Sequence, residues 1–421
     1  MAVKRIQPER RPAFSPNREV GLRGAETHAR LLQAGLGVLD EAGYHGARDD
    51  AIAERASCSR PTFYQYFADK ADFFFHLATQ VNEELGELTR AFPRVDRGRR
   101  SRDELCDWLA RFDDLRRRYA PVFRFEALLR SDPRIARGSE ERMLGTGRII
   151  AAAIDEPLPA RAPLAYHCAL VFVTVTQAFC ATPRRIAAER LIEGAADWIR
   201  RCFVEPLQRV DATQAGRAGE RPQHGGSRRS PPKRPALGRK AAQSRARLVD
   251  AARDAFGSLG YEGTRVDDVA FAASMSHGTV YRYFSGKEEL FRELATPAVE
   301  DVLVLLEELP DPRGGFDAWS RRLYQTYSIH CGLFSAWAES ERARAVLDPN
   351  LGREIDAAIE AALGHRPSGD RATDALLLLS HVERAPYVVR IYPSLAQPDA
   401  VVATGEILER GFFGSAGPGP A

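Results

Sequence analysis

Apolar side chains recur at helical spacing in two distant segments of this 421-residue chain. They fall at i, i+3, i+4, i+7, i+8 and i+11, which is one face of a helix with about 3.6 residues per turn. In the second segment these positions hold Leu248, Ala251, Ala252, Ala255, Phe256 and Leu259. In the first they hold Leu31, Ala34, Gly35, Val38, Leu39 and Ala42. Each pattern predicts an amphipathic helix that ends at a glycine able to adopt positive φ, Gly43 and Gly260.

The two segments belong to an internal repeat. A shift of 217 positions lays Arg30–Ala78 on Arg247–Ala295 without a gap, and about 20 of the 49 positions are identical. A repeat of this length in a chain too long for one hydrophobic core predicts two successive lobes.

The pattern outside the basic and Gly/Pro-rich segments is helical nearly throughout. Residues 171–176, VFVTVT, are β-branched and taken alone favour a strand. No partner strand is evident nearby, and the surrounding apolar run is too long for a lone strand, so we predict a buried helix there. The fold class predicted is therefore all-α.

Composition divides the chain further. Residues 209–240 contain five Gly, four Pro and nine Lys or Arg, too few apolar side chains to order themselves. We expect a disordered basic arm at residues 1–25 and a disordered tail at residues 414–421. We call residues 26–78 and 241–295 the first and second heads, 79–206 and 296–413 the first and second bundles, and 207–240 the linker. The linker is either a solvated tether or an auxiliary contact for phosphates.

Charge and cysteine content restrict the class of protein. The net charge is only +3, so affinity for nucleic acid must come from local clustering of positive charge. No apolar run approaches the roughly 20 residues that cross a bilayer, and no signal peptide is evident, so we expect a soluble cytoplasmic protein without a membrane partner. The six cysteines are scattered, which favours reduced thiols over disulfides or a metal site. No cofactor is expected.

Each head has the pattern of a helix-turn-helix. A second helix is expected over about Asp49–Ala56 and Val266–Ala273, with a capping box formed by Thr264 and Asp267 in the second head. Ser59 and Ser276 are placed to cap a third helix, over about Arg60–Tyr66 and His277–Tyr283, by accepting a backbone hydrogen bond. A short helix of this kind enters the major groove of DNA with its N-terminal residues leading.

Both heads resemble the N-terminal DNA-binding domain of the TetR family of transcriptional regulators. The matching residues are Ser59-x-x-Thr62-x-Tyr64-x-Tyr66-Phe67-x-x-Lys70 and Ser276-x-Gly278-Thr279-x-Tyr281-x-Tyr283-Phe284-x-x-Lys287. The resemblance implies two tandem units, each a three-helix head followed by a helical bundle for ligand binding and dimerisation. The chain departs from the family where Ser57 and Ser274 replace a turn glycine, and where Pro61 stands opposite Gly278.

The resemblance also implies roles for individual residues. Hydroxyls at the third-helix threonine and tyrosine would donate to phosphate oxygens, and the lysine at the start of the fourth helix would meet another phosphate. The residues concerned are Thr62, Tyr64, Lys70, Thr279, Tyr281 and Lys287, beside the caps Ser59 and Ser276. Base-facing positions hold Arg60 and Gln65 in the first head and His277 and Arg282 in the second. The heads should then prefer different half-sites, although either arginine could instead hold a phosphate. Tyr66, Phe67, Tyr283 and Phe284 are expected to pack.

The bundles are rich in aromatic side chains, which sequence cannot divide between packed core and ligand pocket. The candidates for contact with a small hydrophobic effector are Trp108, Phe112, Phe123, Trp319, Tyr327 and Trp337. Dimerising helices, by the resemblance, would be 164–180 with 185–203, and 372–390 with 399–413.

Because one chain holds both copies, we hypothesise an intramolecular pseudo-dimer with its heads about one DNA turn apart. A flexible 32-residue coil spans roughly 30 Å, close to the roughly 34 Å between half-sites. The rival is a dimer of tandem chains with four heads.

The function predicted is a sequence-specific regulator that binds a double-stranded DNA operator, a repressor released by a small-molecule effector. The alternative is an architectural DNA-binding protein whose bundles serve only for pairing. An enzyme is not expected, because no Gly-rich phosphate loop, H-E-x-x-H or G-x-S-x-G motif is present. His167 and His381 lie in apolar runs and are predicted to be core residues.

Overall fold

The computed structural model describes residues 22–124, 134, 138–180, 186–206, 238–309, 311, 314–339, 341–346, 349–364, 370–392 and 397–414. The chain forms two compact units. One comprises residues 1–90 and 111–139, and the other residues 91–110 and 140–421. The basic arm up to residue 21, the linker over residues 207–237 and the tail after residue 414 lie outside the described residues.

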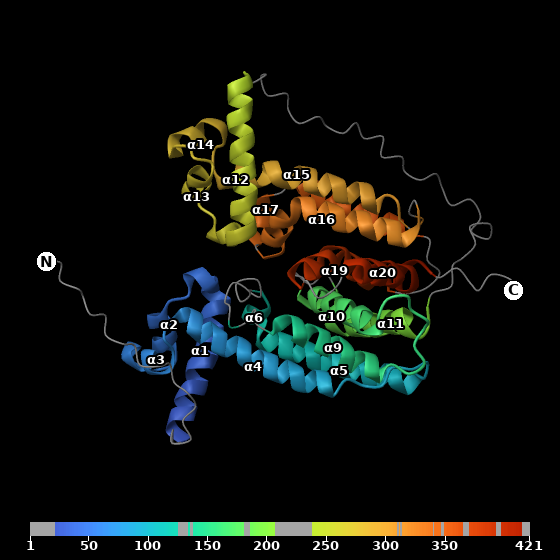
Figure 1. The fold of residues 1–421 in the computed structure, drawn as a ribbon. Coiled ribbons are helices and arrows are strands. Elements are labelled where there is room, and N and C mark those ends of the chain that lie inside the picture. The colour runs from blue at the N-terminus through green and yellow to red at the C-terminus, as the bar shows by residue number, and fades with distance from the viewer. Residues whose placement is uncertain are drawn as a thin grey trace. The chain divides into compact units, whose positions relative to one another are not determined.

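The first head lies in the first unit (Figure 1). Its helices are α1 (Leu22–Gly46), α2 (Asp49–Arg55) and α3 (Arg60–Tyr66), followed by the longer α4 (Lys70–Arg90). Three phenylalanines, Phe63, Phe67 and Phe73, are at most 1% exposed and form the centre of this core. Helix α6 (Ala120–Arg124) packs against α1 and α4. Helix α5 (Arg99–Arg118) contributes its first part to the second unit and its last part to the first.

The second head lies in the second unit. It consists of α12 (Arg239–Gly263), α13 (Val266–Ala272) and α14 (His277–Tyr283), followed by α15 (Lys287–Leu306). The rest of the second bundle comprises α16 (Gly315–Glu339), α17 (Glu341–Val346), α18 (Pro349–Leu363), α19 (Arg371–Ile391) and α20 (Gln397–Leu408), which ends in a π-helical turn at Glu409–Phe413.

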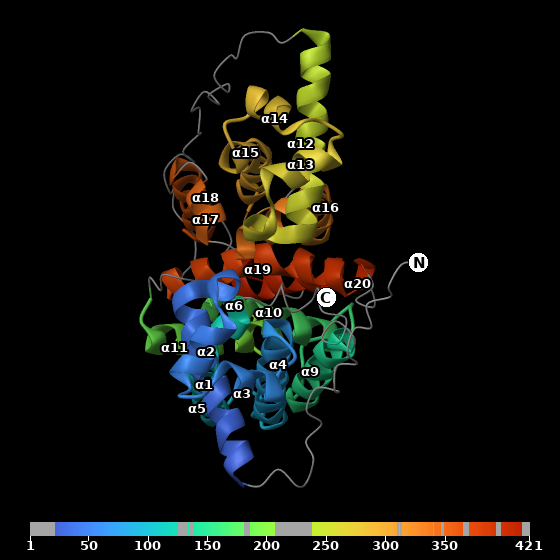
Figure 2. The ribbon, with the colours of Figure 1, turned by 90° about the vertical axis from the view of Figure 1, so that its left-hand side faces the viewer.

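Three helices of the first bundle also belong to the second unit: α9 (Ser139–Ala153), α10 (Leu164–Cys180) and α11 (Ala188–Phe203). Helix α10 packs against α19 and α20, and α11 packs against α19 and the π-helical turn. Figures 1 and 2 both show α19 and α20 running beside α10 and α11. The last helices of the two bundles therefore share one apolar core within this unit.

The all-α prediction is confirmed. Residues 171–176 lie inside α10, where Val171 and Thr174 are buried, so helix packing prevails over their β-branched composition. Among the described residues, the only β-type pairing is an isolated bridge between Val95 and Ile154. None of the described helices is both long enough and apolar enough to span a bilayer.

Three local predictions need correction. Helices α1 and α12 do not end at Gly43 and Gly260; each is kinked there, with φ 68° and ψ 172° or 176°, and continues for one further turn. Only glycine adopts this combination readily, because a Cβ would clash. Helix α1 already begins at Leu22 and α12 at Arg239, so residues 22–25 and 239–240, which we expected in the arm and the linker, are helical.

The capping box predicted for Thr264 and Asp267 is wrong. Thr264 is 1% exposed, and its hydroxyl donates to the carbonyls of Ala255 and Gly260 on either side of the last straight turn before the kink. Asp268 instead accepts a hydrogen bond from the backbone N–H of Arg265, at 2.8 Å. The threonine therefore closes the preceding helix rather than opening the next.

Candidate nucleic-acid interface

The third helix of each head begins with the serine cap that the sequence predicts. The Ser59 hydroxyl accepts from the backbone N–H of Thr62 at 3.2 Å, and Ser276 accepts from Thr279 at 3.3 Å. In both heads the serine and threonine hydroxyls are also hydrogen-bonded to each other, at 2.8 Å. The bounds of α3 and α14 are those predicted, and Pro61 lies in the first turn of α3. The two helix N-termini are thus built alike.

The turn before each cap contains a residue with positive φ. Ser57 and Ser274 both have φ 53°, in the region that favours glycine. The backbone N–H of Ser57 bonds the carbonyl of Glu54 at 2.9 Å, and that of Ser274 bonds Phe271 at 2.9 Å. The turn keeps the conformation that glycine usually supplies, at the expense of strain on a serine.

Exposure along the third helix follows the same order in both heads. Phe67 and Phe284 are buried and pin the helix, as predicted, while Tyr66 and Tyr283 are half-buried. The caps, the tyrosines and the base-facing positions are exposed, and the threonines and lysines are half-buried. Tyr64 is 43% exposed and Tyr281 is 50% exposed. The residues predicted to touch DNA therefore share one accessible face in each head.

Acidic residues of the second helix hold some of these side chains, differently in the two heads. The Tyr64 hydroxyl donates to Asp49 at 2.6 Å and accepts from Arg60 at 3.3 Å. In the second head, His277 contacts Asp267 through Nδ1 at 2.5 Å and stacks on the Tyr281 ring, with centroids 4.8 Å apart. The two faces thus differ in charge arrangement as well as in sequence.

The lysines at the start of the fourth helix have a contact that sequence reasoning missed. Lys70 Nζ donates to the carbonyl of Tyr44 at 2.8 Å and lies 4.7 Å from the centre of its ring. Lys287 does the same with Tyr261, at 2.9 Å and 4.4 Å. Burial lowers the pKa of Lys70. Each lysine therefore ties its helix to the kinked end of the first helix, next to Gly43 or Gly260.

A signal for this contact was present in the repeat. Tyrosine and lysine are retained in both copies, 26 residues apart in each. Because Tyr44 and Tyr261 follow the kink glycines directly, their carbonyls are among the groups that a broken helix leaves available. The phosphate contact that the resemblance implies for these lysines stays a prediction.

Most aromatic candidates for an effector contact are packed in the core. Trp108, Phe112 and Trp319 are at most 2% exposed, Tyr327 is 5% exposed, and Phe123 is half-buried. The Trp319 indole donates to the carbonyl of Leu305 at 2.8 Å, a contact within its own bundle. The side chain of Trp337 lies outside the described residues. Burial does not decide between packing and a ligand, so these assignments stay predictions.

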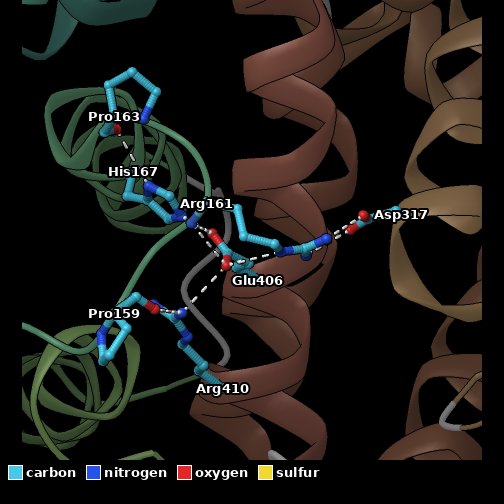
Figure 3. Close-up of polar contacts among 7 residues, drawn as sticks. All are labelled: Pro159, Arg161, Pro163, His167, Asp317, Glu406 and Arg410. Atoms are coloured by element: carbon cyan, nitrogen blue, oxygen red, sulfur yellow. Dashed lines mark hydrogen bonds and ion pairs between the residues drawn. The ribbon is translucent and has the colours of Figure 1, made fainter.

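Two polar clusters lie where the last helices of the two bundles meet. Figure 3 shows the first, centred on Glu406 of α20, which is 4% exposed. Its carboxylate is 2.7 Å from His167 Nε2 on α10 and 3.3 Å from Arg161 Nε. Arg410 lies 3.2 Å away. Burial raises the pKa of Glu406, but the His167 hydrogen bond and the nearby arginines outweigh it and lower the pKa to about 2. Glu406 is therefore a buried carboxylate with its charge compensated.

The second cluster joins α11 to α19. Arg201 is hydrogen-bonded to Asp374, and Arg190 pairs with Asp370 at 2.6 Å. These residues line a cavity of about 700 Å³ whose wall is mostly charged. The remaining lining residues are Glu193, Gly194, Asp197, Glu360, Arg371 and Ala372. None of the aromatic candidates lines this cavity, whereas small-molecule pockets are lined predominantly by apolar and aromatic groups.

Helices α10 and α19 also meet through polar contacts of their own. His381 is fully buried, and its Nδ1 lies 2.8 Å from the Thr174 hydroxyl. Burial lowers the pKa of His381 to about 3, with the backbone of Thr404 opposing the shift. His167 and His381 are both core residues, as the sequence predicts.

The heads define a helix-turn-helix protein, and comparison with known proteins specifies the family. The model for bacterial regulatory proteins of the tetR family matches twice, at residues 31–77 and 248–294. The chain therefore carries the N-terminal domain of the TetR family twice, once in each head.

Similar proteins include bacterial transcriptional regulators. The uncharacterized HTH-type transcriptional regulator YhgD of Bacillus subtilis is 35% identical over 15% of this chain and 34% of its own length. The HTH-type transcriptional activator FasR of Mycolicibacterium smegmatis is 33% identical over 22% of this chain and 43% of its own. The chain thus spans less than half the length of these relatives.

Among solved structures, the transcriptional regulator FadR from Bacillus subtilis in complex with stearoyl-CoA has a TM-score of 0.31. It is 14% identical and covers 39% of this chain and 95% of its own. A likeness at this level does not extend the ligand of that protein to this chain.

Proposed function

We propose that the chain is a sequence-specific DNA-binding regulator that uses both heads on one operator. The observation that carries this proposal is the matched construction of α3 and α14, each capped by a serine and each exposing the same positions on one face. A capped helix N-terminus attracts phosphate, and the exposed tyrosines lie beside it. The side chains at the base-facing positions differ between the heads, so we expect an operator with two unlike half-sites.

Base readout in the second head is assigned to Arg282, which is exposed on α14. Arginine recognises guanine through two hydrogen bonds, and each such pair contributes about 1–3 kcal/mol of discrimination. We expect Arg282→Ala to relax the preference at one base pair, with the affinity for random DNA lowered only slightly. A selection from randomised duplexes checks this. Gln65→Ala, at the same position of the first head, should relax a different base pair. Loss of affinity for all duplexes alike would assign Arg282 to a phosphate instead.

The two heads, as proposed, act as one intramolecular pseudo-dimer. This is supported by the packing of α10 and α11 against α19 and α20 within one compact unit, with buried polar contacts such as His167–Glu406. The rival arrangement is a dimer of tandem chains with four heads. Sedimentation of the free protein and of its operator complex separates the two: the proposal requires one chain per operator, and a footprint that covers one pair of half-sites.

We also propose that the regulator is a repressor released by a small-molecule effector. An effector acts by binding the form with low DNA affinity more tightly, which lowers the DNA-competent population. A thermal-shift screen tests this, because a ligand of the folded state raises the melting temperature in proportion to its occupancy. The compound found should also release the operator.

The cavity beside Arg201 favours a second candidate, an architectural protein whose bundles serve only for pairing, because the wall of this cavity is mostly charged and none of the aromatic candidates lines it. It would bind DNA with the same heads, but no compound in the screen would both raise the melting temperature and release the operator.

A further inference from the structure

The contacts between α10 and α19 follow one register. Thr174 meets His381 at 2.8 Å, and Arg384 donates to Gln177 at 2.7 Å. Both pairs are separated by 207 residues along the chain. In a two-fold pairing of like helices, equivalent positions of the two copies meet near the axis. A shift of 207 therefore maps α10 onto α19.

This register brings two buried ionisable residues into correspondence. His167 plus 207 is Asp374, and the two side chains are 1% and 3% exposed. Each contacts the last helix of the other bundle: His167 lies 2.7 Å from Glu406 of α20, and Asp374 is hydrogen-bonded to Arg201 of α11. The two-fold that maps His167 onto Asp374 also maps the His167–Glu406 contact onto the Asp374–Arg201 contact, so Glu406 and Arg201 take matching places across the interface. One structural position is thus a base in the first bundle and an acid in the second, each opposite its complement.

The complementarity would be lost if like bundles paired. Two second bundles would bring Asp374 against Glu406, two carboxylates that are both buried here. Two first bundles would bring His167 against Arg201, and the Arg201 guanidinium would lose the buried carboxylate of Asp374. Like charges facing each other across an interface suppress wrong partners, because neither can be solvated once buried.

We propose that these two pairs make the interface heterotypic, so that the first bundle accepts the second bundle and neither accepts its own kind. The inference rests on the proposed pseudo-dimer and specifies which bundle can pair with which. The partner surface of the first bundle presents His167 and Arg201, and it fits a surface that carries an acid at both matching positions. The second bundle of the same chain supplies Glu406 and Asp374.

The test uses variants of the full-length chain in which the charges that determine pairing are altered. Within one chain, Asp374→Arg places the new guanidinium against that of Arg201, which is repulsive. When two second bundles meet, the same guanidinium faces the carboxylate of Glu406, which is attractive. We expect this variant to form two-chain species in sedimentation, with self-association at least about tenfold tighter than for the unaltered protein. Adding Glu406→Arg removes that complement. The double variant Asp374→Arg/Glu406→Arg should therefore lose the two-chain species.

Two outcomes overturn the inference. One is an Asp374→Arg variant whose self-association is unchanged, and the other is a double variant that associates as strongly as the single one, which would indicate non-specific aggregation. Because a single variant can fail to fold, the exchanged pair Arg201→Asp/Asp374→Arg provides a second measurement. It should regain most of the melting temperature that each single change loses, and no recovery would mean that the contact does not determine pairing.

The proposed function is judged separately. A mass of two chains for the unaltered protein would contradict the one-chain pseudo-dimer. The pairing rule is tested by the change that Asp374→Arg makes to that starting mass, so failure of one does not imply failure of the other.

Discussion

The lysine at the start of the fourth helix shows how one side chain can hold two elements together. Lys70 and Lys287 each donate to a tyrosine carbonyl just after a kink glycine, and each lies over the ring of that tyrosine. Such a lysine can hold the head together and still offer positive charge to a phosphate, because an ammonium group has three donors. Its structural and electrostatic effects are separable by experiment.

Lys287→Ala should lower the melting temperature of the second unit and weaken binding to all duplexes about equally. If the ammonium also neutralises a phosphate, the slope of log affinity against log salt concentration should fall by roughly 1. Titrations at several salt concentrations, together with thermal melts, measure both effects. A lower melting temperature with an unchanged slope would leave the lysine with a structural role only. Arg353→Ala, at an exposed position of α18 in the second bundle, is the control for loss of one charge.

Positive φ at a serine predicts a stabilising substitution. Ser274 has φ 53°, which costs a residue with a side chain about 1 kcal/mol relative to glycine. Ser274→Gly should therefore raise the free energy of unfolding by several tenths of a kcal/mol up to about 1, after the entropy that glycine gains when unfolded. Gly260→Ala, at φ 68° and ψ 176°, is the matched opposite and should destabilise. Denaturant unfolding of both variants gives the signs, and a destabilising Ser274→Gly would mean that the serine hydroxyl outweighs the strain.

At the scale of elements, the third helix is where sequence and structure agree best. Its bounds, its serine cap and its buried phenylalanine are set by neighbouring residues, so local pattern is sufficient to predict them. The ends of the first helices are harder to predict, because a kink glycine that ends one helical segment can be followed directly by another helical turn. Thr264 was assigned to the wrong helix for the same reason: its spacing fits a cap, but its hydroxyl donates to the carbonyls of Ala255 and Gly260 beside the kink.

Loss of the serine cap should weaken the third helix more in the head where less else supports the start of that helix. Ser276→Ala removes the acceptor for the Thr279 N–H, at a cost of about 1 kcal/mol. Ser59→Ala removes the same bond from α3, where Pro61 already fixes the first turn. We expect the second head to lose more DNA affinity than the first, measured on duplexes with one half-site destroyed. Equal losses would show that the proline contributes nothing to the helix start.

At the scale of the whole molecule, the repeat predicts two lobes, and the resemblance names the helices that meet. The particular contacts could not be predicted, because they depend on a register between residues more than 200 positions apart. His167 and Asp374 share no sequence signal; their equivalence follows only from the Thr174–His381 and Gln177–Arg384 contacts. The residues that line an effector pocket could not be predicted either, because aromatic side chains at helical spacing suit a core and a pocket equally.

The buried histidine between the bundles predicts a pH dependence. Because the folded pKa of His381 is lowered to about 3 from 6.5, the unfolded chain binds a proton between these values and the folded chain does not. Stability is therefore greatest above pH 6.5 and falls as pH decreases toward 3. Between pH 6.5 and pH 5 the loss from this group is about 1.5 kcal/mol. The Glu406 carboxylate adds a loss only below its unfolded value of 4.5, as pH falls toward 2.

His381→Leu should remove this part of the pH dependence while it changes the overall stability. Urea unfolding followed by tryptophan fluorescence measures it, because the Trp198 ring lies 6.4 Å from His381. Leu378→Ala, a buried change on the same helix that removes no titratable group, is the control and should keep the unaltered slope. Parallel curves for the unaltered protein and His381→Leu would mean that folding does not change the pKa of His381.

The exchange of a base at residue 167 for an acid at residue 374 has a consequence for the cell that holds this protein. Regulators with one common architecture risk exchanging subunits with their relatives, and every mixed species would sit on the wrong promoter. When the two bundles of one chain pair with each other, the interface is occupied and a subunit of another regulator cannot bind to it. The shared chain keeps the two bundles close together. The His167–Glu406 and Asp374–Arg201 pairs then disfavour association with the bundles of related proteins.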